Sequence, residues 1–170
     1  FATVDEIYET NASWNHEFQF LKPQTALDAE LGWETGGARR GGRAALYAAR
    51  VKDEIHLDPY SAGIGNTNLP PLQRYGLELE ARTSWQALQL SGAYTLAFAR
   101  FTAGNYNGVD LDGKDVPLVP RHKVALNLAW QASAVTKVTV SANHVSRQYM
   151  DNDESNTLGV RIPAYTVVDA

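Results

Sequence analysis

Two glutamates stand two positions apart in the middle of the chain, Glu78 and Glu80. Paired carboxylates of this kind can act as general acid and general base, as they do in glycosidases. Arg74 and Arg82 flank them at even spacing, so that in an extended strand all four side chains share one face. This arrangement favours an ion network on a wetted surface over catalysis. Since the chain also lacks the G-x-S-x-G, H-E-x-x-H and G-x-G-x-x-G motifs, we expect no catalytic residue and no enzyme.

Metal chemistry is equally weakly indicated. The segment from Asp110 to Asp115 places carboxylates two apart before a glycine, as a calcium loop does, but the closing glutamate is absent at the required offset. We expect a solvated turn there and a charged loop tip at residues 151–154. The histidines fall at no spacing typical of metal ligands, and we expect them to be structural or exposed; they are His16, His56, His122 and His144. No metal site and no cofactor is predicted.

The composition of the 170 residues narrows the class of protein. No apolar run is long enough for a membrane-spanning helix, so a chain of this kind would cross a bilayer with strands. There is no cysteine, which excludes disulfides and thiolate sites, and the net charge of -4 gives no basic footprint for nucleic acid. The first residues lack the features of a signal peptide, so we expect that the peptide has been removed or that the chain begins inside a longer gene.

Apolar and polar residues alternate with period two in about six separate stretches, and a seventh begins at Ala164. No stretch shows a sustained helical period. The alternation predicts an all-β chain of six to seven strands, each with one apolar and one polar face. Aromatic residues near the strand ends are expected on the apolar face, as a girdle at a membrane interface or as the core of a soluble protein; they are Trp33, Tyr75, Trp130 and Tyr165.

The links between these strands alternate in length along the chain. Residues 35–42, 84–87 and 132–136 form short links, whereas residues 56–73, 100–122 and 147–163 form long ones. In an antiparallel meander every second link lies at the same end of the sheet. The sequence therefore predicts an up-and-down transmembrane β-barrel with short periplasmic turns and long extracellular loops, the first of which ends at Thr25. A soluble β-sandwich binding module is the alternative, although it has no reason to sort its loops by length.

Several short segments, in order, resemble those of TonB-dependent receptors. Leu21-Lys22-Pro23-Gln24-Thr25 followed by Glu30-Leu31-Gly32 is similar to the "LKPE-T/S … ELG" signature of that family. Further similar segments lie at residues 1–8, 51–55, 66–68, 74–79, 93–95, 117–122, 149–153 and 163–169. Each segment alone is short, but the ordered set covers nearly the whole chain.

This resemblance implies that residues 1–170 are part of a single receptor β-barrel domain of about twenty-two strands. The plug domain, the TonB box and the last strands are not in this sequence. It also implies a Gram-negative outer membrane location, contact with its lipid, and an interaction with the TonB complex through the missing N-terminal part. The expected function is energised uptake of a scarce ligand, most often a ferric siderophore and otherwise haem, cobalamin or a sugar. A different outer-membrane barrel, an adhesin or a porin, remains the main alternative.

Two groups of residues are candidates for function. Binding residues concentrate on loops held by a rigid scaffold, and residues 100–122 form the loop richest in polar and aromatic groups. The candidate ligand-binding residues are Arg100, Asn105, Tyr106, Asn107, Asp110 and Asp112. The residues expected to face the lumen and the plug are Asp28, Glu30, Arg74, Glu78, Glu80 and Arg82.

Overall fold

The computed structural model describes residues 21–37, 39–58 and 65–170. The segment at residues 1–8 that resembles the receptors, His16 and most of the first expected loop lie outside this range. All regular structure in the described residues is β, and none of them forms a helix long and apolar enough to cross a membrane. The strands are β1 (Thr25–Gly36), β2 (Arg40–Lys52), β3 (Ile55–Asp58), β4 (Gly65–Asn68), β5 (Leu72–Trp85), β6 (Leu88–Phe101), β7 (Asn105–Tyr106), β8 (Val109–Asp110), β9 (His122–Gln131), β10 (Lys137–Val145), β11 (Gln148–Tyr149), β12 (Arg161–Ile162) and β13 (Tyr165–Asp169).

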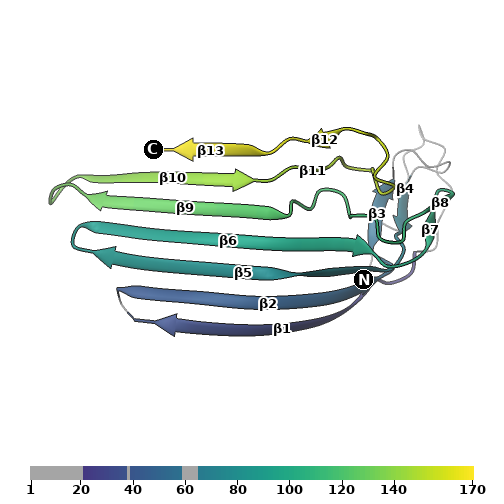
Figure 1. The fold of residues 1–170 in the computed structure, drawn as a ribbon, viewed down its shortest axis with the longest axis horizontal. Helices are drawn as coiled ribbons and strands as arrows, with labels where there is room; N and C mark the ends of the chain where they lie inside the picture. The colour runs from purple at the N-terminus through teal and green to yellow at the C-terminus, as the bar shows by residue number, and fades with distance from the viewer. Residues whose placement is uncertain (1–20, 38, 59–64) are drawn as a thin grey trace.

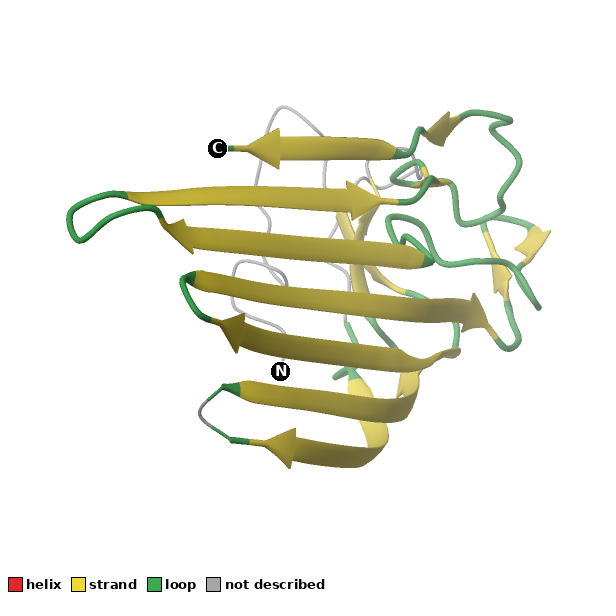
Figure 2. Ribbon diagram, turned by 60° about the vertical axis from the view of Figure 1, so that its left-hand side comes forward, coloured by secondary structure: helices red, strands yellow, loops and turns green. Residues whose placement is uncertain are grey.

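Seven long strands form one antiparallel meander in the order β1-β2-β5-β6-β9-β10-β13 (Figure 1). The predicted all-β, up-and-down arrangement is confirmed. Short turns lie at one end of the sheet and the long links gather at the other (Figure 2). The sheet is open, since in the described part of the chain β1 and β13 each pair with one strand only. Each long link contains a small two-stranded hairpin that the alternation pattern did not predict, namely β3-β4, β7-β8 and β11-β12.

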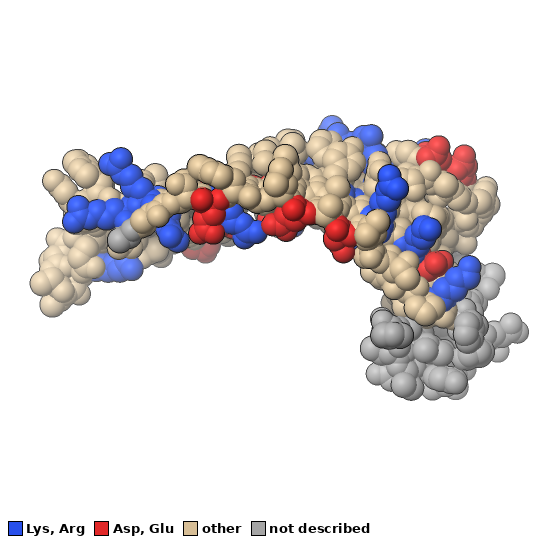
Figure 3. Space-filling view, turned by 90° about the horizontal axis from the view of Figure 1, so that it is seen from below, with Lys and Arg blue, Asp and Glu red and all other residues tan. Residues whose placement is uncertain are grey.

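The strand register separates two faces of the sheet. We call one the charged face, and it carries Asp28, Glu30, Glu34, Arg43, Arg74, Glu78, Glu80, Arg82 and Lys123. We call the other the apolar face, and it carries Leu27, Leu31, Trp33, Leu46, Leu77, Leu79, Leu90, Leu126, Leu128 and Trp130. In Figure 3 acidic side chains gather on the lower side of the sheet.

The apolar face is uncovered in the described part of the chain. Leu27 is 74% exposed and Leu31 73%, which are values for side chains that no protein layer covers. A continuous apolar surface of this extent belongs against lipid or another protein and not against water.

Aromatic residues border the apolar face at both ends. Trp33, Trp85 and Trp130 lie near the short turns, and Tyr75 stacks on Phe98 near the long links, with ring centroids 5.1 Å apart. Along β5, the segment from Tyr75 to Trp85 is about 33 Å long at the usual rise per residue. With the usual strand tilt of roughly 40°, its height is about 25 Å, which matches the apolar band of an outer-membrane barrel.

One aromatic residue was placed on the wrong face by the sequence. Tyr165 pairs with Val145, Val145 with Lys123, and Lys123 with Thr95, which lies beside Glu78 on the charged face. The strand β13 has a valine on each face, since Val167 and Val168 follow each other. The sequence alternation therefore does not show which side chains of β13 lie on the apolar face. The pairing of β13 with β10 does show this.

The buried core of the described residues lies at the loop end, on the charged face. Val51, Leu72 and Phe101 are neighbours across β2, β5 and β6 and are nearly inaccessible to solvent. Leu111 and Val116, from the link after β6, pack against them. The long links therefore fold back over the charged face instead of extending away from the sheet.

This folding corrects two expectations about the links. Asp153 is 1% exposed and Glu154 7%, so residues 151–154 are not a solvated loop tip. The expected solvated turn at residues 110–115 is solvated only in part: Asp110 and Asp112 are exposed, but Leu111 between them is fully buried. A buried apolar residue such as Leu111 therefore holds an otherwise polar link against the sheet.

Candidate ligand-binding site

The β7-β8 hairpin, in the second long link, carries exposed polar residues. Asn107 and Gly108 occupy its tip with φ values of 50° and 82°. Positive φ at both central residues of a two-residue loop is the type I′ turn, which Asn-Gly adopts readily. The turn places Asn105 directly opposite Asp110, and both residues are exposed.

The base of this hairpin is firmly attached. The Leu111 N–H donates to the carbonyl oxygen of Gly104 at 2.9 Å, which closes the hairpin on the side of the buried core. Gly104 has φ 105° and lies against Pro70, so close that a Cβ there would be 2.7 Å from the proline Cβ. Asp110 Oδ1 accepts a hydrogen bond from the Asp112 N–H at 3.1 Å. A rigid base therefore presents a polar tip to solvent.

The structure divides the six candidate ligand-binding residues into two groups. It brings Asn105, Asn107, Asp110 and Asp112 together on or beside the hairpin, and Tyr106 packs half-buried against the core. Arg100 lies apart from them. Its side chain is on the apolar face of β6, and its Nε donates to Asp115 Oδ1 at 3.0 Å. That the hairpin residues contact a ligand remains a prediction.

Asp115 is a connecting residue that sequence reasoning missed. Its carboxylate also accepts from Arg121, at 3.1 Å, and its N–H donates to Asn156 Oδ1 at 2.8 Å. Asn156 Nδ2 in turn donates to the carbonyl oxygens of Asp115 and Asp153. This network joins the second long link to the third. Its members are far apart in sequence, so no local spacing indicates it.

A second connection joins the first long link to the third. His56 Nε2 lies 3.1 Å from Glu154 Oε1 and 3.0 Å from Asn152 Oδ1. The hydrogen bond to Glu154 raises the pKa of His56 above its usual value, and burial opposes this only in part. The histidine therefore fastens one loop to another most strongly when it is protonated.

We expect this connection to weaken as the pH rises. A pKa that is higher in the folded state contributes stability that is fully present below the unfolded value of about 6.5 and is lost as the pH passes the folded pKa. Hydrogen exchange of residues 148–160 in the full-length receptor should therefore rise above pH 6.5 relative to a His56→Gln variant. Equal pH dependence in both proteins would contradict this role of His56.

The charged face forms the other candidate surface. All six residues expected to face the lumen share it. A hollow of about 400 Å³ is lined by two of them, Glu80 and Arg82, together with Glu34 and Arg43. Glu30 accepts from Arg43 at 3.1 Å, but both side chains are about half exposed, so this pair contributes little stability. Arg74 is instead paired with Glu54 at 2.7 Å and ties the sheet to the first long link. Contact of this face with a plug remains a prediction.

Neither surface shows a metal centre. Among the described residues, no three histidine, aspartate or glutamate side chains gather in a group that could hold an ion. Many polar atoms at the loop end instead hydrogen-bond one another, whereas Asp153 Oδ2 is buried without a partner among the described residues.

The comparison with protein families decides the identity of this scaffold. The family "TonB dependent receptor-like, beta-barrel" matches residues 1–170. The chain belongs to the TonB-dependent receptors. Receptors of this family are transporters and not enzymes, and they lie in the outer membrane of Gram-negative bacteria. The exposed apolar face fits that environment.

Solved structures of TonB-dependent receptors share the fold. The ferric yersiniabactin receptor FyuA from Yersinia pestis is 20% identical with a TM-score of 0.66, over 86% of this chain and 22% of its own. The ferric citrate transporter FecA is 17% identical with a TM-score of 0.68, over 84% and 22%. The copper transporter OprC is 16% identical with a TM-score of 0.64, over 88% and 23%. The chain thus spans about a fifth of these receptors, and no curated protein sequence matches it.

Proposed function

We propose that this chain is part of the barrel of a receptor that imports a ferric siderophore with energy from the TonB complex. Membership of the family is the observation that carries the proposal. Two of the three similar structures above are named for ferric chelates, which favours iron over copper as the metal of the cargo. TonB would act through the N-terminal part of the longer protein, and the plug would rest on the charged face.

The hairpin supports this assignment by its chemistry. Asn105 and Asp110 are exposed and present amide and carboxylate groups side by side near the base of the hairpin, in a link that folds over the charged face. Such groups recognise a polar chelate by hydrogen bonds to its ligand atoms. A rigid base reduces the loss of conformational entropy on binding, because the tip is already ordered.

The hairpin can be removed while its base is kept. Gly104 and Leu111 already contact each other through a backbone hydrogen bond, so residues 105–110 can be replaced by two glycines, and of the core contacts only that of the half-buried Tyr106 is lost. In the full-length receptor we expect this change to weaken binding by at least about tenfold, as the loss of a contact cluster commonly does. Ferric citrate, a ferric catecholate, a ferric hydroxamate and a copper chelate are the probes, and equilibrium binding is the measurement.

The control is a change in an exposed turn at the other end of the sheet. Replacing residues 133–135, in the turn between β9 and β10, by glycine and serine should leave binding unchanged, and both variants should insert normally into the outer membrane. Binding of the copper chelate alone would overturn the assignment to ferric siderophores. Full affinity after removal of the hairpin would instead exclude the hairpin as a contact site.

A further inference from the structure

The apolar face carries arginines at its loop end. Arg50 and Arg100 lie on either side of Gln73 across β2, β5 and β6, and the register puts all three on the face of Leu27. The next row of this face holds Tyr75 and Phe98, the stacked aromatic pair. The Arg121 guanidinium lies 5.4 Å from the centre of the Phe98 ring. On the apolar face, a row with arginines therefore lies next to the aromatic border, on the side of the long links.

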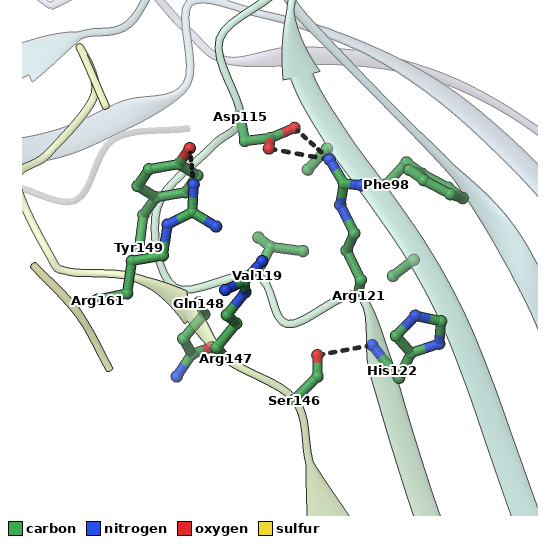
Figure 4. A pocket seen from close by; sticks show the side chains of 12 residues that line it. Phe98, Asp115, Val119, Arg121, His122, Ser146, Arg147, Gln148, Tyr149 and Arg161 are labelled. Carbon is green, nitrogen blue, oxygen red and sulfur yellow. Dashed lines mark hydrogen bonds and ion pairs between the residues drawn. The ribbon is translucent and has the colours of Figure 1, made fainter. Parts of the chain in front are cut away.

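A pocket extends this cationic border toward β11 and β12. Strand β9 begins at His122, opposite Leu96, so the last residues of β6 have no β9 partner. The space beside them holds a pocket of about 480 Å³ (Figure 4). Phe98 and His122 line it from the apolar face, and the guanidinium groups of Arg121, Arg147 and Arg161 surround it.

Positive charge exceeds negative charge at this place. Asp115 is the one carboxylate in the pocket wall, and it is shared by Arg100 and Arg121. Among the described residues, no carboxylate forms an ion pair with Arg50, Arg147 or Arg161. All three are exposed. Arg161 lies over the Tyr149 ring at 4.0 Å and donates a hydrogen bond to the Tyr149 hydroxyl oxygen. No carboxylate of the described residues compensates the charge of these three arginines, so an anion from outside the chain can do so.

The surface next to these arginines is apolar and slightly hollowed. Ala29 and Ala48 leave a shallow depression on the apolar face, bounded by Leu31, Leu77 and the Tyr75-Phe98 pair. A molecule with an anionic head beside Arg50 and Arg100 would have its apolar part against this depression. Arginines beside an apolar depression favour a ligand that has both an anionic head and an apolar part over a free anion.

We propose that this border binds the phosphate groups of a phosphorylated glycolipid, the lipid A portion of the outer-leaflet lipopolysaccharide. Arginine donates paired, parallel hydrogen bonds to phosphate, and several guanidinium groups in a row suit a headgroup with more than one phosphate. The aromatic border marks the level where the hydrocarbon ends, and the arginines lie beyond it at the level of the headgroups. The site is separate from the hairpin and does not depend on which ligand the receptor imports.

The test uses the full-length receptor, purified in detergent and stripped of lipid. The variant replaces Arg50, Arg147 and Arg161 with glutamine, and leaves the Asp115 network intact. The control replaces Arg43, Arg82 and Lys123 with glutamine, which removes the same charge from the charged face. Binding is measured by native mass spectrometry with lipid A, with dephosphorylated lipid A and with inorganic phosphate.

We expect the receptor and the control to bind lipid A equally, and the variant to bind it at least about tenfold more weakly. Dephosphorylated lipid A should bind about as weakly to the receptor as lipid A does to the variant. Unchanged binding by the variant, or equal loss in the control, would overturn the site. Displacement of lipid A by inorganic phosphate at equal concentration would show an anion site without lipid selectivity, and so would overturn the lipid assignment. Affinity for the imported ligand should not change when Arg50, Arg147 and Arg161 are replaced.

Discussion

A Leu79→Arg substitution should destabilise the receptor by about 2–4 kcal/mol, because it places a charge against lipid near the middle of the membrane. Leu79 lies on the apolar face of β5, roughly half-way between the aromatic borders at Tyr75 and Trp85. Its side chain is 39% exposed, so the arginine would have no protein layer around it. The free energy of unfolding from lipid vesicles, obtained by denaturant titration of the full-length receptor, is the measurement.

The control moves the same charge to the opposite face of the sheet. Ala93 pairs with Glu80, and its exposed side chain lies on the charged face. An arginine there would lie beside a carboxylate, and we expect the free energy of unfolding to change by less than about 1 kcal/mol. Equal destabilisation by the two substitutions would mean that the apolar face does not meet lipid.

Much of the sheet was predictable because its strands are amphipathic. In β1, Leu27, Leu31 and Trp33 alternate with acidic residues, and a shift of one residue would expose all of these charges to lipid. The alternation of short and long links indicated which strand ends lie at the turn end of the sheet and which lie at the loop end. Where amphipathicity fails, as in β13, the orientation of Tyr165 came from pairing alone.

The links were less predictable because long-range contacts shape them. Nothing near Leu111 in sequence indicates that Phe101 and Val116 enclose it, and nothing near Asp115 indicates Arg100 or Asn156 as its partners. The Asn107-Gly108 turn was the exception, since its residue types alone favour a tight hairpin. The polar composition of residues 100–122 thus pointed to a candidate binding loop, but it did not separate Arg100 from the hairpin.

The two candidate surfaces differ in how their polar groups are paired. The Asp115 network and the His56–Glu154 pair join all three long links at one end of the sheet. The charged face away from the links carries half-exposed ion pairs such as Glu30–Arg43. A partner that approaches this face can exchange those pairs for its own at small cost, whereas a ligand at the hairpin meets a surface that is already ordered.

Among the described glycines, Gly76 leaves the least room for a side chain, and a Gly76→Ala substitution should impair folding severely. A Cβ at this position would be 2.1 Å from the Leu96 carbonyl oxygen and 2.6 Å from the Tyr47 hydroxyl oxygen. The tyrosine can turn away, but the carbonyl belongs to the backbone of β6, so β5 and β6 would have to separate. We expect a loss of about 3 kcal/mol, at the upper end of the range for overpacked sites.

The matched control is Gly32→Ala in β1, on the same charged face. The nearest atoms to a Cβ at Gly32 are 3.8 Å away, which is ordinary contact, and alanine has the lower conformational entropy in the unfolded chain. Heat-dependent migration of the full-length receptor in detergent gels reports the folded barrel fraction for both variants. A second variant, Gly76→Ala with Tyr47→Ala, separates the two contacts. Since the Leu96 carbonyl remains in place, we expect no recovery, and recovery would show that the tyrosine alone makes the position intolerant.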